Sequence, residues 1–208
     1  MLSGHGSDVA ALARTTRADW IAAADTALSA IVAECGAPVA IVGSSAGGLL
    51  ALHLALTRPG DVRAIVCLGT PIFLSPRQSL IIRAALRLPR ALLPRSLREV
   101  RKIHGPNVSD PALAAALRSL PAYPLEALGE LLRLMSSVRA RLAEIRAPVL
   151  IAHGALDSTV RRRQINALAA GLTQSAVERL DLPASAHLVA IDRDRDQLAA
   201  RVISFLSH

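Results

Sequence analysis

The chain has 208 residues, of which 24 are basic and 16 acidic, and a formal net charge of +8. A chain of this length can bury one substantial hydrophobic core, so we expect a single domain that can accommodate one insertion. Its two cysteines, Cys35 and Cys67, lack the spacing of a metal site or of a disulfide framework, and the start of the chain lacks the basic and apolar regions of a secretory signal. These features predict a cytoplasmic protein without a metal site.

One uncharged stretch is long enough to suggest a membrane span. The 23 residues from Cys35 to Thr57 contain no Asp, Glu, Lys or Arg. However, Pro38, Gly43 and Gly47 interrupt the stretch, which favours a short strand followed by a short helix. We therefore expect no stable membrane anchor.

Strands and helices alternate along the chain. Apolar residues recur three and four positions apart over residues 15–34, which predicts a helix. The elements expected after it are a strand at 38–42, a helix at 46–57, a strand at 62–68, a strand at 148–152, a helix at 160–170, a strand at 176–182 and a helix at 194–206. Apolar strands separated by helices predict an α/β fold with a mostly parallel sheet that is covered on both faces.

Residues 71–145 interrupt this alternation. They contain eight of the twelve prolines, 12 of the 24 basic residues and only five of the 16 acidic residues. Two amphipathic helices are expected here, with apolar faces formed by Leu80, Ile81, Ala84, Ala85 and Leu88 in one and by Leu125, Leu128, Leu131, Leu132, Met135, Val138 and Leu142 in the other.

The position of this segment, after the strand at 62–68, favours a helical cap, or lid, over an active site, although helices simply packed on the core are the alternative. The domains predicted are thus a core of residues 1–70 and 146–208 and a cap of residues 71–145. Nucleic acid is not an expected partner, because the chain has only four Trp, Tyr and Phe residues on which bases could stack and its basic residues are almost all arginine.

A Gly-x-Ser-x-Gly sequence lies between the strand at 38–42 and the helix that follows it. The segment runs from Gly43 to Gly47, with Ser45 at its centre. A strand–turn–helix context is typical of a turn that exposes a catalytic serine, and we expect side chains at Gly43 and Gly47 to collide with neighbouring elements. Ser45 is the predicted nucleophile, with a glycine-rich phosphate loop or an ordinary turn as the alternative.

Two further residues complete a possible catalytic set. Asp157 follows the strand at 148–152, and His187 follows the strand at 176–182. The carboxyl ends of parallel strands form one edge of the sheet, where sites in such folds lie. We expect His187 to take the proton of Ser45 and Asp157 to orient the imidazole.

Other polar residues have simpler explanations. His53 is expected to pack in the core, and His153 to position the turn before Asp157. Arg161, Arg162 and Arg163 are predicted to form a solvated helix start. The segment from Asp192 to Asp196 alternates in charge and is predicted to form the exposed start of the last helix.

The chain resembles the bacterial carboxylesterase and monoacylglycerol lipase group of α/β-hydrolases. The matching segments are Leu2-Ser3-Gly4-His5-Gly6, Asp19-Trp20, the segment from Gly43 to Gly48 and the segment from Ser185 to Asp192. The resemblance implies an α/β-hydrolase fold and a serine esterase or lipase that hydrolyses short- to medium-chain acyl esters or monoacylglycerols through an acyl-enzyme, without a cofactor. Ser45, Asp157 and His187 each fall on a matching catalytic position.

The chain departs from that group at its amino terminus. In the family the Gly-His-Gly loop follows the fourth strand, whereas here it begins at Gly4, which implies an N-terminally shortened sheet. The N–H of Ala46 would supply one oxyanion donor, and the second would come from a family loop that has no counterpart here. A rival alignment assigns this loop to residues 5–8.

The missing strands would also leave the strand at 38–42 at an open sheet edge. A truncated or internally started gene product would explain this, as would a minimal form that covers the edge as a homodimer. A catalytically weak or inactive protein that binds a small apolar ligand is the alternative to the ester hydrolase.

Overall fold

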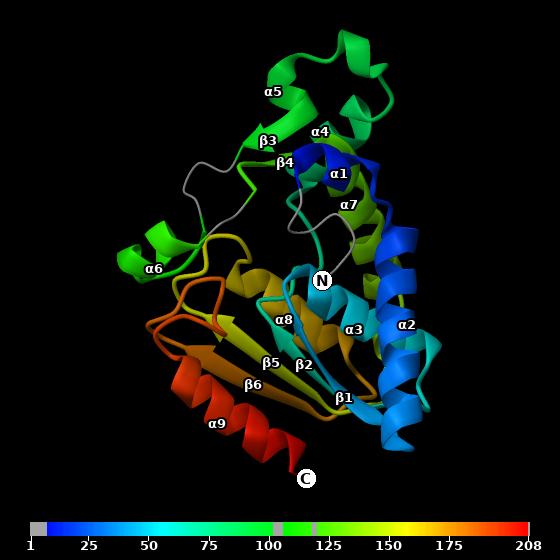
Figure 1. Ribbon diagram of the computed structural model, residues 1–208, viewed down its shortest axis with the longest axis vertical. Coiled ribbons are helices and arrows are strands. Elements are labelled where there is room, and N and C mark those ends of the chain that lie inside the picture. The colour runs from blue at the N-terminus through cyan, green and yellow to red at the C-terminus, as the bar shows by residue number, and fades with distance from the viewer. Residues whose placement is uncertain (1–7, 102–105, 118–119, 208) are drawn as a thin grey trace.

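The computed structural model describes residues 8–101, 106–117 and 120–207. Four parallel strands form the main sheet in the order β1-β2-β5-β6 (Figure 1). Their bounds are β1 Val39–Ser44, β2 Val62–Leu68, β5 Val149–Gly154 and β6 Val177–Leu182. The α/β class, the parallel sheet and all four strands are confirmed, with bounds that differ from the expected ones by at most two residues.

Helices cover the two faces of the sheet unequally. The helices α2, α3, α7 and α8 contribute to one large apolar cluster, and α9 packs on the opposite face (Figure 1). Their bounds are α2 Arg17–Cys35, α3 Ala46–Thr57, α7 Leu125–Arg139, α8 Arg162–Gly171 and α9 Arg195–Leu206. The uncharged stretch noted in the sequence is thus divided among the end of α2, strand β1 and helix α3, and most of α3 is buried.

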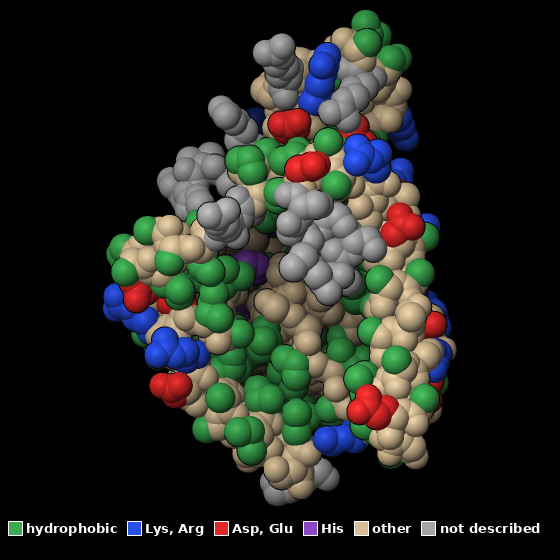
Figure 2. All heavy atoms as spheres, viewed as in Figure 1, with side chains coloured by type: hydrophobic (Ala, Val, Ile, Leu, Met, Phe, Trp, Pro, Cys, Tyr) green, Lys and Arg blue, Asp and Glu red, His purple; other side chains and the backbone are tan. Residues whose placement is uncertain are grey.

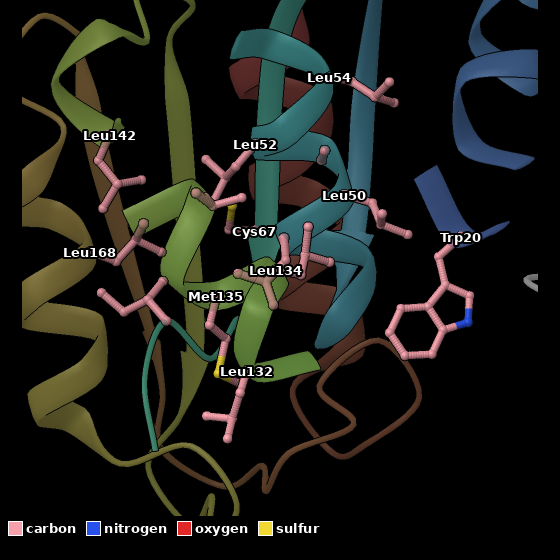
Figure 3. Close-up of a cluster of buried hydrophobic side chains, with 14 of the residues drawn as sticks. Trp20, Leu50, Leu52, Leu54, Cys67, Leu132, Leu134, Met135, Leu142 and Leu168 are labelled. Atoms are coloured by element: carbon pink, nitrogen blue, oxygen red, sulfur yellow. The ribbon is translucent and has the colours of Figure 1, made fainter. Parts of the chain in front are cut away.

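The larger cluster connects these helices through their side chains. Figure 3 shows Trp20 from α2, Leu50, Leu52 and Leu54 from α3, Leu132, Leu134 and Met135 from α7, and Leu168 from α8. Each buried side chain of this size contributes roughly 1.5–3 kcal/mol relative to its exposed state. Because α7 shares this cluster, the second half of the segment at 71–145 is joined to the core.

Most of the rest of that segment rises beyond the carboxyl ends of the strands (Figure 1). This part contains α4 Pro76–Ala85, the 3-10 turn η1 Arg90–Leu92, α5 Arg95–Arg98, β3 Glu99–Arg101, α6 Pro111–Ala116 and β4 Ala122–Pro124. The 3-10 turn η2 Leu142–Glu144 follows α7, contacts α8 and precedes β5. Strands β3 and β4 form an antiparallel pair, and α1 Val9–Arg14 packs against β4 and α7.

The apolar face expected for α4 is wrong except at Ala85, which is buried. Leu80 and Ile81 are exposed, whereas Ile82, which the expected face did not include, is buried. Helix α4 packs on α7, where a side chain in place of Gly129 would collide with Leu86, the residue that follows α4. The sequence pattern identified an amphipathic helix but not the side on which its neighbour lies.

The sheet is fully covered only at its centre. Strands β2 and β5 are almost entirely buried, but Val42 in the edge strand β1 is 51% exposed. Figure 2 shows hydrophobic side chains gathered between α9 and α2, where β1 lies in Figure 1. Coverage of both faces is therefore wrong at Val42, and among the described strands β1 lies at the edge of the sheet, as expected.

Within the described ranges, no helix combines the length and hydropathy that a membrane crossing requires.

Candidate active site

Ser45 has an unusual backbone conformation. Its φ is 52° and its ψ is −119°, and it is the one non-glycine residue with positive φ in the part of the chain that the structure describes. Such a conformation costs on the order of 1–3 kcal/mol. It persists because the Ser45 N–H donates to the Leu68 carbonyl at 2.8 Å, while the Ser45 carbonyl accepts from the Gly48 N–H at 3.0 Å. The Ser45 hydroxyl does not cap α3, so it is not used to begin the helix.

The glycines around Ser45 have different roles. A Cβ at Gly43 would lie 2.4 Å from the Gly47 carbonyl oxygen, and a Cβ at Gly48 would lie 1.9 Å from Thr70 Oγ1. A Cβ at Gly47 would meet nothing within 4 Å. The expected collision is therefore confirmed for Gly43 and wrong for Gly47. In the first turn of α3 the crowded position is Gly48 rather than Gly47, because α3 approaches Thr70 there.

This difference predicts opposite results for two matched substitutions. Gly43→Ala should lower the free energy of unfolding by about 3 kcal/mol or more, because the new methyl group meets backbone atoms that cannot rotate away. Gly47→Ala should leave it unchanged or raise it by up to about 1 kcal/mol, because alanine favours the helix in which Gly47 lies. Urea unfolding of both variants measures the difference, and equal losses would contradict the geometry.

Asp157 and His187 form a buried pair. His187 Nδ1 lies 2.8 Å from Asp157 Oδ2, and the two residues are 7% and 9% exposed, respectively. The other carboxylate oxygen accepts the N–H groups of Thr159 and Val160, at 2.7 and 2.8 Å. Both oxygens therefore have partners, and the Nδ1–H tautomer leaves Nε2 of His187 free to accept a proton.

His153 supports the turn that carries Asp157. Its Nε2 lies 2.8 Å from the Val160 carbonyl oxygen, to which it donates in the Nε2–H tautomer. A Cβ at Gly154 would lie 2.1 Å from the Ala186 carbonyl oxygen, so the loops after β5 and β6 touch through their backbones. The predicted structural role of His153 is confirmed, although its hydrogen-bond partner, Val160, follows Asp157 in the sequence.

Gly69 connects the serine turn to the Asp157–His187 pair. It follows Leu68, the residue that accepts the Ser45 N–H. A Cβ at Gly69 would lie 3.2 Å from His187 Nδ1 and 3.4 Å from Asp157 Oδ2. Ser45 therefore lies at the same sheet edge as the pair, although no hydrogen bond joins it to His187 among the residues that the structure describes. Catalytic hydrogen bonds are often long without substrate.

The N–H of Ala46 is placed to receive negative charge. Ala46 is the first residue of α3, and no described residue accepts its N–H. The rival alignment places a second donor in residues 5–8, which fall outside the described residues except for Asp8, the N-cap of α1.

Neither Cys67 nor His53 offers a competing centre. Burial raises the pKa of the Cys67 thiol to about 12, so the thiolate does not form at neutral pH. Burial, with Arg141 and Arg17 nearby, lowers the pKa of His53, which is only partly buried rather than packed in the core and is neutral at neutral pH. No three His, Cys, Asp or Glu side chains converge as metal ligands within the described ranges, from which His5, His104 and His208 are excluded.

Asp192 overturns one expectation. It was predicted to be exposed, but it is 1% exposed and accepts the Ala186 N–H at 2.8 Å and the Ser109 N–H and O–H at 2.8 and 2.6 Å. Burial acts to raise the pKa of Asp192, but these hydrogen bonds and that of the Arg193 N–H hold the pKa below its usual value of 3.8. Charge alternation could not reveal this, because Ser109, which supplies two of the donors, lies 83 positions away in the sequence.

Asp192→Ala should lower the free energy of unfolding by about 3–5 kcal/mol near neutral pH, because buried donors lose a charged acceptor. Since the pKa of Asp192 is lowered in the folded state, its contribution is complete above about pH 5 and is lost as the pH falls below 3.8. Denaturant unfolding at pH 7 and at about pH 2 measures both effects. Asp196→Ala is the matched control, because the Asp196 side chain is 95% exposed, and an equal loss there would contradict the prediction.

Comparison with known proteins identifies the family and the fold of the chain. The family model described as "Serine aminopeptidase, S33" matches residues 2–194. The chain is 27% identical over 207 residues to the thermostable monoacylglycerol lipase of Bacillus sp. (strain H-257), covering 99% of this chain and 77% of that protein.

Solved structures have the same fold. A structure described with LipS and LipT, two metagenome-derived lipolytic enzymes, aligns with a TM-score of 0.84 at 22% identity, over 99% of this chain and 79% of that one. A thermostable carboxyl esterase from Bacillus coagulans, solved in complex with glycerol, aligns with a TM-score of 0.70 at 16% identity, over 93% and 72%. The chain has the α/β-hydrolase fold and belongs to the serine aminopeptidase S33 family.

Proposed function

We propose that this protein is a serine carboxylic ester hydrolase that acts on short- to medium-chain acyl esters or monoacylglycerols. The observation that carries the proposal is the buried Asp157–His187 pair beside a serine with positive φ. The relative with 27% identity is a monoacylglycerol lipase, which supports an ester of this class as the substrate. The catalytic roles proposed are Ser45 as nucleophile, His187 as general base and acid, and Asp157 as the residue that orients it.

Acylation begins when the Ser45 hydroxyl attacks the ester carbonyl carbon. His187 Nε2 takes the hydroxyl proton, because Nδ1 is occupied by its bond to Asp157. The carboxylate stabilises the imidazolium that forms, and the Ala46 N–H donates to the developing oxyanion. The tetrahedral intermediate then collapses, and His187 returns the proton to the alcohol as it leaves. The acyl group remains on Ser45.

Deacylation repeats these steps with water. His187 takes a proton from the water molecule, which attacks the acyl carbon, and then returns the proton to Ser45 as the acid is released. No redox step or external electron donor is required. The chemistry therefore needs only the side chains and backbone donors of the site.

A series of p-nitrophenyl esters of increasing acyl length, together with monoacylglycerols, tests this proposal. We expect a burst of p-nitrophenol followed by steady turnover, and kcat/KM should rise by up to roughly fourfold per buried CH₂ until the acyl pocket is filled, as expected for about 0.8 kcal/mol per group. Aminoacyl p-nitroanilides, measured in parallel, test the peptidase activity that the family description suggests. A folded protein that turns over neither class would overturn the proposal and leave a hydrolase-fold protein that binds a small apolar ligand.

A further inference from the structure

The loop that carries His187 has no regular secondary structure. It extends from the end of β6 at Leu182 to the start of α9 at Arg195. Backbone N–H groups in such a loop must find acceptors outside a helix or strand when they are buried. The acceptors for the N–H groups of residues 186–188 come from Asn107 and Asp192.

Asn107 contacts the backbone of His187 directly. The His187 N–H donates to both the backbone carbonyl and the side-chain Oδ1 of Asn107, at 3.1 and 3.0 Å. The Leu188 N–H donates to the same backbone carbonyl at 3.1 Å. Asn107 lies 80 positions earlier in the sequence, between β3 and α6, in the segment at 71–145.

The other side of the Asn107 amide faces the loop of the acid. Because a backbone N–H donates to Oδ1, the amide orientation is determined, and Nδ2 donates to Ser158 Oγ. Ser158 follows Asp157, and the carboxylate of Asp157 accepts the N–H groups of Thr159 and Val160. One amide therefore connects the loop of His187 with the loop of Asp157.

Ser109 anchors the same segment two residues later. Its N–H and O–H both donate to the buried carboxylate of Asp192, which also accepts the N–H of Ala186, the residue before His187. The backbone of residues 186–188 is thus held from both sides, by Asn107 directly and by Ser109 through Asp192. This arrangement leaves the His187 loop little freedom to shift relative to Asp157.

We propose that Asn107 is a positioning residue for His187, which sets the imidazole against Asp157 and directs Nε2 toward Ser45. The kinetic consequence rests on the function proposed above, but the positional role does not. It follows that the segment at 71–145 holds the catalytic base at this point, and cannot move away from the sheet here without displacing His187. A displacement of about 1 Å in a catalytic group can lower a rate by on the order of 10²-fold.

Three variants test this role in the full chain. Asn107→Ala removes the link to Ser158 and one of the two acceptors for the His187 N–H, so kcat should fall by about 10- to 100-fold with KM changed less than about twofold. Asn107→Asp should restore most of kcat, because a carboxylate accepts both the His187 N–H and the Ser158 O–H. Asn166→Ala is the matched control, because Asn166 bonds the exposed Arg179 side chain from α8 and should leave kcat unchanged.

A second readout does not depend on activity. The proton shared by His187 Nδ1 and Asp157 should give a far-downfield NMR resonance, assigned by its loss in His187→Gln. We expect the resonance to shift or broaden in Asn107→Ala and to persist in Asn107→Asp and Asn166→Ala. If Asn107→Ala does not fold, Ser158→Ala replaces it, with a several-fold loss of kcat and a smaller shift expected.

The outcomes separate the two proposals. A protein that hydrolyses no ester, but whose resonance changes in Asn107→Ala, would support the role of Asn107 and overturn the proposed function. An active protein in which Asn107→Ala, or its substitute Ser158→Ala, leaves kcat and the resonance unchanged would overturn the role of Asn107. A lower melting temperature alone, with kcat per folded molecule unchanged, would also overturn it.

Discussion

Replacing Ser45 with alanine is expected to lower kcat for ester hydrolysis by on the order of 10⁶-fold, because the variant has no atom that can form the acyl-enzyme. A fluorophosphonate probe should label the wild-type protein at Ser45, as shown by peptide mass spectrometry, and should leave Ser45→Ala unlabelled. The hydroxyl is not used to cap α3, so its removal should change the free energy of unfolding little.

The neighbouring serine provides the control. Ser44 is exposed at the end of β1, and Ser44→Ala should retain both labelling and turnover. Ser45→Gly should be inactive but more stable than Ser45→Ala by about 1 kcal/mol, because glycine adopts a φ of 52° without the steric cost of a Cβ. Labelling at Ser44, or activity retained without Ser45, would contradict the assignment of the nucleophile.

Replacing Asp157 with asparagine is expected to lower kcat by about 10⁴-fold. The amide oxygen can still accept the Thr159 and Val160 N–H groups, which turns the amide nitrogen toward His187 Nδ1. An amide N–H donates, so Nδ1 must become the acceptor and the imidazole proton moves to Nε2. Once Nε2 carries this proton, His187 can no longer take the proton of Ser45. Steady-state kinetics and thermal unfolding distinguish this tautomer effect from loss of folding.

Asp181→Asn is the matched control for this substitution. Asp181 lies in β6 and its carboxylate is about half exposed, paired with Arg162 at 2.8 Å. Surface ion pairs of this kind contribute about 0–1 kcal/mol, so the variant should keep full activity and nearly full stability. A loss of less than tenfold in Asp157→Asn, with the control unchanged, would show that Asp157 does not orient the base.

Much of the fold and the candidate site could be predicted because their signals are local. The strand–turn–helix around Ser45 occupies a short continuous segment, and its apolar periodicity changes where β1 ends and α3 begins. Asp157 follows the buried strand β5 and His187 follows the edge strand β6, and parallel strands bring their carboxyl ends to one edge. The sequence by itself therefore determined the order of the strands and helices along the chain, the parallel sheet and the placement of these three side chains at one edge.

The tertiary structure alone decided which long-range contacts hold those side chains. Asn107 carries no pattern in the sequence, because His187 lies 80 positions away from it, and the burial of Asp192 depends on Ser109, which lies 83 positions away. Leu80 and Ile81 are exposed, and Gly48 rather than Gly47 is crowded, because burial depends on where α7 and Thr70 come to lie. Periodicity records which elements form, whereas contacts between distant loops depend on how the completed elements pack, and only the folded chain determines that packing.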